Sequence, residues 1–167
     1  MTIYTVDKKT FAVLDENNAT VASLLYTNNA FDDAIIEAAE KFALNGITTG
    51  TWITYGIDDN STKIRSKIRV ETGGVISVRL PWKKKKYLFK KSAGWKLRFS
   101  LVDHAGEDVL TLVPTVNWQK ESHDYILQLN EEFEEECDSF LILQAVHSAN
   151  CSLSMMTGGK VPALVSI

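Results

Sequence analysis

The stretch FLILQAVHSANCSLSMM, from Phe140 to Met156, decides the fold of this chain. From Ser139 to Gly159 no residue is charged, and Asp138 or Ser139 is suited to cap the start of a helix. The 19 positions from Asp138 to Met156 make a helix of about 28 Å at 1.5 Å per residue.

This helix is expected to be enclosed by protein on nearly all sides. Six polar residues inside the stretch weigh against a membrane span, and a solvated face would normally carry Lys, Glu or Arg. Strands of about eight residues reach about 27 Å, so a sheet wrapped around the helix matches it in length. Gln144, His147 and Asn150 must then find hydrogen-bond partners inside.

Most of the chain before the helix has the pattern of short strands joined by turns. The N-terminal residues alternate apolar and polar, and further strand patterns are FAVLDE, TVASLLYT, GTWITYGI, KIRSKIRV, GVISVRL, KKYLFKK, WKLRFSLVD, EDVLTLVPTV and DYILQLNEEF. Short connections indicate antiparallel neighbours, and a sheet of about ten strands must curl or close to protect its edges. We therefore predict a mainly β, single-domain protein over residues 1–167, an antiparallel, many-stranded, closed or nearly closed barrel around a buried hydrophobic helix at about 138–156.

One segment before the helix carries conflicting signals. NNAFDDAIIEAAEKFALNG looks helical by local rules, because Asn29 is suited to be an N-cap, Asp32 and Asp33 fall in the first turn, and Gly46 follows the end. Helix propensity is a weak prior that tertiary context often overrides. Helix and strand both stay open for residues 30–45.

Three parts of the sequence together carry a family resemblance. They are the final stretch FLILQAVHSANCSLSMM, the approach to it through the turn 103–106 (DHAG) and the strand DYILQL, and the opening KTFAVLDENNATVASLLY. In this pattern the chain resembles the tubby C-terminal-like group, which includes the LURP-one-related proteins and the phospholipid scramblases. The ending A-V-H-x-A-N is similar to that of small bacterial members. The resemblance implies a barrel around a central helix and strand for parts of Asp33–Leu44, and it carries over no activity.

Basic residues concentrate between Lys63 and Arg98. This segment holds 13 of the 18 basic residues against one acid, Glu71, so it carries +12 and the rest of the chain −15. Alternation in KIRSKIRV places the four basic residues on one face of a strand and Ile, Ser and Val on the other. The same alternation in WKLRFSL places Lys96, Arg98 and Ser100 outward, with Trp95, Leu97, Phe99 and Leu101 toward the core.

These cations are the predicted binding site of the protein. The anion-binding set is Lys63, Arg65, Lys67, Arg69, Arg79, Lys83, Lys84, Lys85, Lys86, Lys96 and Arg98. Clustered Lys and Arg attract anionic lipid headgroups at about 1 kcal/mol per residue, and Trp82 is suited to be an interfacial anchor. In tubby proteins a K-x-R pair contacts a phosphoinositide headgroup, and the stretch 63–66 (KIRS) is similar to it.

Other interpretations of the basic segment stay open. The outer face of any barrel must be polar, and the acidic stretch Glu131–Asp138 is expected to fold back and neutralise part of the charge. An acidic protein is an alternative partner. Single-stranded nucleic acid ranks lower, because Trp95, Phe99, Tyr87 and Phe89 are expected to point to the core rather than to stack on bases.

We expect a protein without enzymatic activity, cofactor, metal or transmembrane segment, located in the cytoplasm, where it is either free or peripheral at the membrane. Two cysteines and the lack of an export pattern at the N-terminus favour a reducing compartment. His104 and His123 are expected at the surface. His147 and Cys151, at i and i+4 on the helix, are interpreted as a core histidine beside a buried thiol with no opening to substrate.

Overall fold

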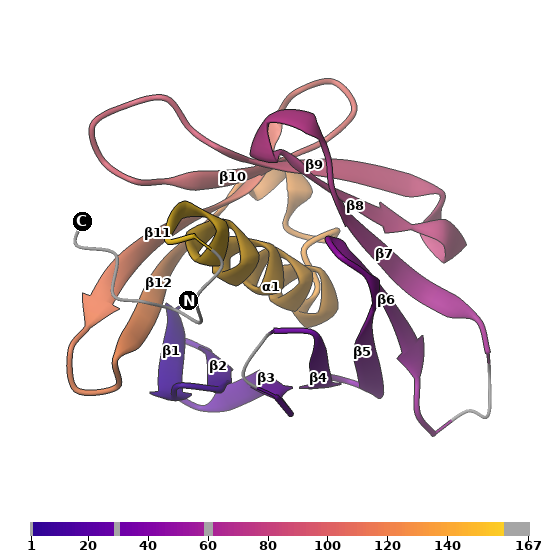
Figure 1. Ribbon diagram of the computed structural model, residues 1–167, viewed down its shortest axis with the longest axis horizontal. Helices are drawn as coiled ribbons and strands as arrows, with labels where there is room; N and C mark the ends of the chain where they lie inside the picture. Colours follow the sequence, from indigo (N-terminus) through magenta and orange to yellow (C-terminus); the bar gives the residue numbers. More distant parts are fainter. Residues whose placement is uncertain (1, 29–30, 59–61, 159–167) are drawn as a thin grey trace.

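Twelve antiparallel strands form one closed barrel around a helix in the computed structural model, which describes residues 2–28, 31–58 and 62–158 (Figure 1). The strands are β1 (Thr2–Asp7), β2 (Thr10–Leu14), β3 (Thr20–Tyr26), β4 (Asp33–Glu37), β5 (Lys41–Thr48), β6 (Thr51–Gly56), β7 (Ile64–Val70), β8 (Ile76–Leu80), β9 (Lys85–Lys91), β10 (Phe99–Val102), β11 (Asp108–Asn117) and β12 (Ser122–Leu129). Three short 3-10 turns, η1 (Thr72–Gly74), η2 (Pro81–Lys83) and η3 (Glu131–Phe133), precede α1 (Ser139–Met156). The predicted fold class is confirmed.

Each strand pairs with its neighbours in chain order, and β1 closes the barrel against β12. At this seam Ile3 lies opposite Tyr125, and Thr5 N donates to Asp124 Oδ1 over 2.7 Å. The Thr5 hydroxyl also donates to the His123 carbonyl oxygen. Closure leaves no free sheet edge, which removes the usual route to edge-to-edge association.

The helix α1 runs through the barrel interior, with Asp138 as its N-cap. The Asp138 carboxylate accepts a hydrogen bond from Leu141 N over 2.8 Å. Every residue from Phe140 to Cys151 is buried, whereas Met155 in the last turn is 42% exposed. The helix therefore supplies the centre of the core, and its last turn is its most exposed part. Within the described residues, no helix has the length and apolar character needed to cross a membrane.

The contested segment is strand, not helix. Residues 33–48 form β4 and β5, which pair with each other and with β3 and β6. Ala34, Ile36, Phe42 and Leu44 are buried in the core. Tertiary structure overrides the local helix propensity here, because two strands complete the barrel wall and bury this alternate set of side chains. The proposed N-cap Asn29 lies outside the described residues. The two strands of this segment raise the number in the barrel from the predicted ten or so to twelve.

The strand predicted from Trp95 is wrong in its first half. Strand β10 begins at Phe99, which pairs with Lys91, and Ser92 N donates to the Arg98 carbonyl oxygen to close the loop between them. Trp95 therefore projects from this loop and is 90% exposed, whereas it was expected in the core. Ser100, expected outward, is buried, with its hydroxyl 3.1 Å from the Ser92 hydroxyl.

Two further expectations about exposure are wrong. His123 is buried within β12 rather than lying in a surface loop. In β7 the alternation breaks at its first residues, because the register with β6 shifts between the Thr54 and Tyr55 pairs. As a result Ile64 is 42% exposed, and Arg65 is half-buried instead of fully outward.

Candidate functional sites

A row of cations crosses three neighbouring strands on the outside of the barrel. Lys67 on β7 lies directly opposite Arg79 on β8, which lies directly opposite Lys86 on β9. Arg69 on β7 points to the same side two residues along, and all four residues are exposed. We call Lys67, Arg69, Arg79 and Lys86 the basic face.

The basic face lacks ion pairs within the part of the chain that the structure describes. None of its four residues has an acidic side-chain oxygen within salt-bridge distance there. Glu71 is the acid that borders it, and its carboxylate accepts a hydrogen bond from the Ser77 hydroxyl over 2.8 Å. These two residues and three of the cations line a hollow of about 70 Å³. Like charges directly opposite each other destabilise a sheet, so this row has an electrostatic cost that an anion would relieve.

The remaining predicted cations lie elsewhere or have partners. Lys83 pairs with Asp138 at 3.1 Å, and Lys85 pairs with Glu136 at 3.0 Å. The acidic stretch before α1 does fold back and neutralise part of the basic segment, as expected. The hydrogen bond from the Lys85 ammonium lowers the pKa of Glu136 below its usual range, and a hydrogen bond from the Tyr87 hydroxyl has a smaller effect in the same direction.

The structure therefore divides the predicted anion-binding set. Arg65 lies 3.8 Å from a Glu40 carboxylate oxygen and 6.0 Å from the Trp82 ring centroid. Lys63 is exposed just before β7, and Lys84 occupies a left-handed turn, with φ of 51°. Lys96 and Arg98 belong to the loop before β10, where Arg98 Nη2 donates to the Thr111 hydroxyl over 3.2 Å. The two strand patterns with alternating cations, KIRSKIRV and WKLRFSLVD, correspond to β7 and β10, which are separated by β8 and β9. The sequence did not indicate that Lys67, Arg79 and Lys86 are opposite one another, because strand register is a property of the fold.

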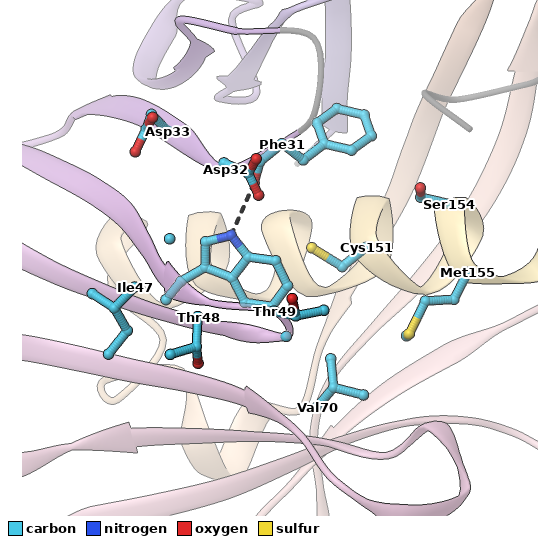
Figure 2. A pocket seen from close by; sticks show the side chains of 13 residues that line it. Phe31, Asp32, Asp33, Ile47, Thr48, Thr49, Val70, Cys151, Ser154 and Met155 are labelled. Atoms are coloured by element: carbon cyan, nitrogen blue, oxygen red, sulfur yellow. Dashed lines mark hydrogen bonds between the residues drawn. The ribbon is translucent and has the colours of Figure 1, made fainter. Parts of the chain in front are cut away.

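A second site lies where α1 emerges from the barrel. A cavity of about 750 Å³ opens there between β4, the β5–β6 turn and the last turns of α1. Phe31, Asp32, Cys151 and Met155 project around it (Figure 2). Trp52 also lines it, and the Trp52 indole N–H donates to the Phe31 carbonyl oxygen over 3.0 Å, drawn as a dashed line.

Cys151 borders this cavity, which corrects the expectation that nothing opens toward the thiol. Its sulfur lies 3.5 Å from His147 Nε2, and His147 Nδ1 lies 2.8 Å from the Tyr26 hydroxyl. Burial, with the Asp32 carboxylate adding repulsion, raises the pKa of the Cys151 thiol far above its usual range. Burial also lowers the pKa of His147 to about 3. Both groups are therefore neutral at pH 7.

The hydrogen-bonded chain behind His147 fixes the position of its proton. The Tyr125 hydroxyl donates to Asn150 Oδ1 over 2.6 Å, and Asn150 Nδ2 donates to the Tyr26 hydroxyl over 3.2 Å. Since the Tyr26 hydroxyl accepts from Asn150, we infer that it donates its own proton to His147 Nδ1, 2.8 Å away, and that the imidazole proton lies on Nε2, facing the sulfur. An imidazole protonated on that nitrogen has no lone pair to accept the thiol proton, and general-base activation of Cys151 requires one. This arrangement suits a satisfied polar core.

Other polar groups in the core are satisfied only in part. Gln144 Oε1 accepts from the Ser66 hydroxyl over 2.8 Å, while Gln144 Nε2 and the Thr54 hydroxyl lack hydrogen-bond partners within the described residues. Among those same residues, no group of three or more His, Cys, Asp or Glu side chains is placed to hold a metal ion.

Comparisons of the chain with family models, with curated proteins and with solved structures gave no match.

Proposed function

We propose that the protein is a non-enzymatic binding module whose basic face holds an anionic surface, the headgroups of a membrane. The observation that carries this proposal is the row Lys67–Arg79–Lys86 across β7, β8 and β9, which lacks ion pairs within the described residues. Cations near an anionic leaflet each gain about 1 kcal/mol, and the same contact would relieve their mutual repulsion.

Two further features support a membrane as the anionic surface. Trp82 is 51% exposed, and Lys83 Nζ lies 4.6 Å from its ring centroid, an aromatic and cation pair of the kind found at membrane interfaces. The barrel around a central helix is also the architecture implied by the resemblance to the tubby C-terminal-like group. Membership of that group, with its lipid-binding members, is part of this proposal.

Substitution of the row tests the proposal. We expect Lys67→Gln, Arg79→Gln and Lys86→Gln combined to weaken binding to phosphatidylserine-containing vesicles by roughly 100-fold, since three cations at about 1 kcal/mol each are lost. Co-sedimentation at low ionic strength measures this, and binding of the wild type should fall as salt is added.

Two matched variants control for net charge and for position. Lys9→Gln, Lys41→Gln and Lys120→Gln remove the same charge outside the basic segment and should bind almost as the wild type does. Lys85→Gln should have a small effect, because this lysine already pairs with Glu136. Equal losses in the row variant and in the first control, or no vesicle binding by the wild type at any salt concentration, would contradict the proposal.

Single-stranded nucleic acid is a second candidate, and one observation favours it. Trp95 is 90% exposed, and Lys96 Nζ lies 4.9 Å from its ring centroid. A base can therefore stack on the exposed ring next to a cation. Titration with an oligothymidine distinguishes this candidate. Quenching of tryptophan fluorescence that disappears in Trp95→Ala, without vesicle binding, would favour nucleic acid over the membrane.

A further inference from the structure

The cavity at the C-terminal end of α1 differs in charge from the basic face. Its lining includes two carboxylates, Asp32 and Asp33, and among the described residues it includes no Lys, Arg or His. The last turn of α1 adds the partial negative charge of a helix C-terminus, since Ser154 and Met155 line the cavity. The electrostatic potential there therefore favours a cation.

The two carboxylates have different surroundings. Asp33 accepts hydrogen bonds from two amides, Asn45 Nδ2 over 2.7 Å and Asn28 Nδ2 over 3.1 Å. The carboxylate of Asp32 is exposed and has no hydrogen bond or ion pair within the described residues. Asp32 is thus the carboxylate that remains available to a ligand.

A glycine fixes the position of Asp32. Gly46 N donates to the Asp32 carbonyl oxygen, and a Cβ at Gly46 would lie 3.3 Å from that oxygen and 3.4 Å from Asp32 Cβ. A larger residue at Gly46 would require Asp32 to shift by a few tenths of an ångström. The close approach of the two strands holds the carboxylate at the rim of the cavity.

Apolar and aromatic side chains form the remaining wall. Phe31 and Trp52 line the cavity and are themselves packed in the core, and Val70 and Met155 lie beside them. Aromatic rings attract cations through the negative charge of their faces. A cavity of about 750 Å³ lies within the range typical of small-molecule sites, which is about 300–1,000 Å³.

We propose that this cavity binds a small organic cation, an ammonium group carried on an apolar body. The ammonium lies against Asp32 at the rim, and the apolar body lies against Phe31, Trp52 and Met155. This site is separate from the basic face and does not depend on the membrane-binding proposal.

Three aromatic probes of similar size and different charge test the inference. We expect benzyltrimethylammonium to bind saturably and to shift the amide resonances of Gly46 and Gly50, with benzyl alcohol weaker and benzoate without effect. Asp32→Asn should weaken binding of the cation roughly fivefold, the size of one exposed charge pair, and should leave benzyl alcohol unchanged. Glu107→Gln, an exposed acid in the β10–β11 turn, is the matched control and should change nothing.

The two cysteines provide a second measurement. Cys151 lines this cavity, and Cys137 lines another of about 520 Å³ at the opposite end of α1, where Arg65, Glu40 and Asp138 mix both charges. In Cys137→Ser, a cationic methanethiosulfonate should label Cys151 faster than an anionic one, and Asp32→Asn should remove the preference. In Cys151→Ser, labelling of Cys137 should not respond to Asp32→Asn.

Several results would overturn the inference. They are equal binding of benzyltrimethylammonium and benzoate, resonance shifts that map away from the β5–β6 turn, or the same affinity for the cation in Asp32→Asn as in the wild type. Loss of vesicle binding in the basic-face variant would leave the cation results unchanged.

Discussion

His147 is a titratable residue at the centre of the core, and its surroundings decide whether the imidazole is charged or neutral. Its ring lies edge-on to Trp52, with centroids 4.9 Å apart, and between the Tyr26 hydroxyl and the Cys151 sulfur. No solvent reaches it, since its exposure is 0%. Burial disfavours the protonated imidazole, and this lowers the pKa of His147 to about 3.

This histidine makes stability depend on pH. Imidazole in the unfolded chain titrates near 6.5, so below that pH the unfolded state binds a proton that the folded state does not, down to about pH 3. The free energy of unfolding should therefore fall as pH decreases through this window, by up to about 1.4 kcal/mol per pH unit. We expect His147→Gln to flatten the slope between pH 6.5 and 5, as measured by urea unfolding.

The exposed histidine supplies the control. The His104 side chain is 88% exposed, so His104→Gln should keep the slope of the wild type. A slope that persists unchanged in His147→Gln would show that other groups cause it.

At the scale of single residues, sequence patterns predicted exposure well inside regular strands and poorly at their ends. Tyr87 and Phe89 are buried as alternation predicts. Trp95 and Ile64 are exposed because alternation stops where β10 has not yet begun and where the β6–β7 register shifts. The cavity at Asp32 was not predicted, because its lining comes from four separate segments and Asp32 carried a helix signal.

Among the elements, α1 was the most predictable. Its uncharged length and its capping residue are local features, and the structure begins it at Ser139 with Asp138 as the cap. The strands β4 and β5 were the least predictable, since alanine-rich sequence favours helix until the neighbours β3 and β6 supply hydrogen bonds and the core supplies burial.

The cap of α1 gives a prediction at this scale. Asp138→Ala removes the acceptor of the Leu141 N–H and the partner of Lys83, and should lower the free energy of unfolding by about 1 kcal/mol. Asp138→Asn keeps an oxygen for the cap and loses only an ion pair of partly exposed side chains, which contributes little. Urea unfolding should rank Asp138→Asn above Asp138→Ala, and equal losses in the two variants would show that the ion pair, which both remove, dominates.

The closed barrel depends on one seam between distant parts of the chain. Asp124 on β12 accepts hydrogen bonds from Thr5 N through Oδ1 and from Asn117 Nδ2, over 3.0 Å, through Oδ2. One carboxylate therefore ties β1, β11 and β12 together where the ladder between β1 and β12 is short.

Removing this carboxylate should weaken the whole molecule at the seam. We expect Asp124→Ala to cost about 1–3 kcal/mol, because the buried Thr5 N–H loses its acceptor, and to speed amide exchange in β1 before the other strands. Asp124→Asn keeps an oxygen at Oδ1 and should lose less. Uniform exchange across all strands in Asp124→Ala would contradict a local role for this residue.

The position of α1 in chain order has a consequence for biosynthesis. The helix that fills the barrel is translated after all twelve strands, and the first strand finds its last partner 119 residues away. At about 5–20 residues per second, the β-rich, apolar part of the chain is exposed for several seconds before α1 has been synthesised. The barrel cannot be completed until α1 has left the ribosome, and pairings so distant in the chain close slowly. Chaperones that hold nascent β-rich segments therefore have a long interval in which to act on this protein.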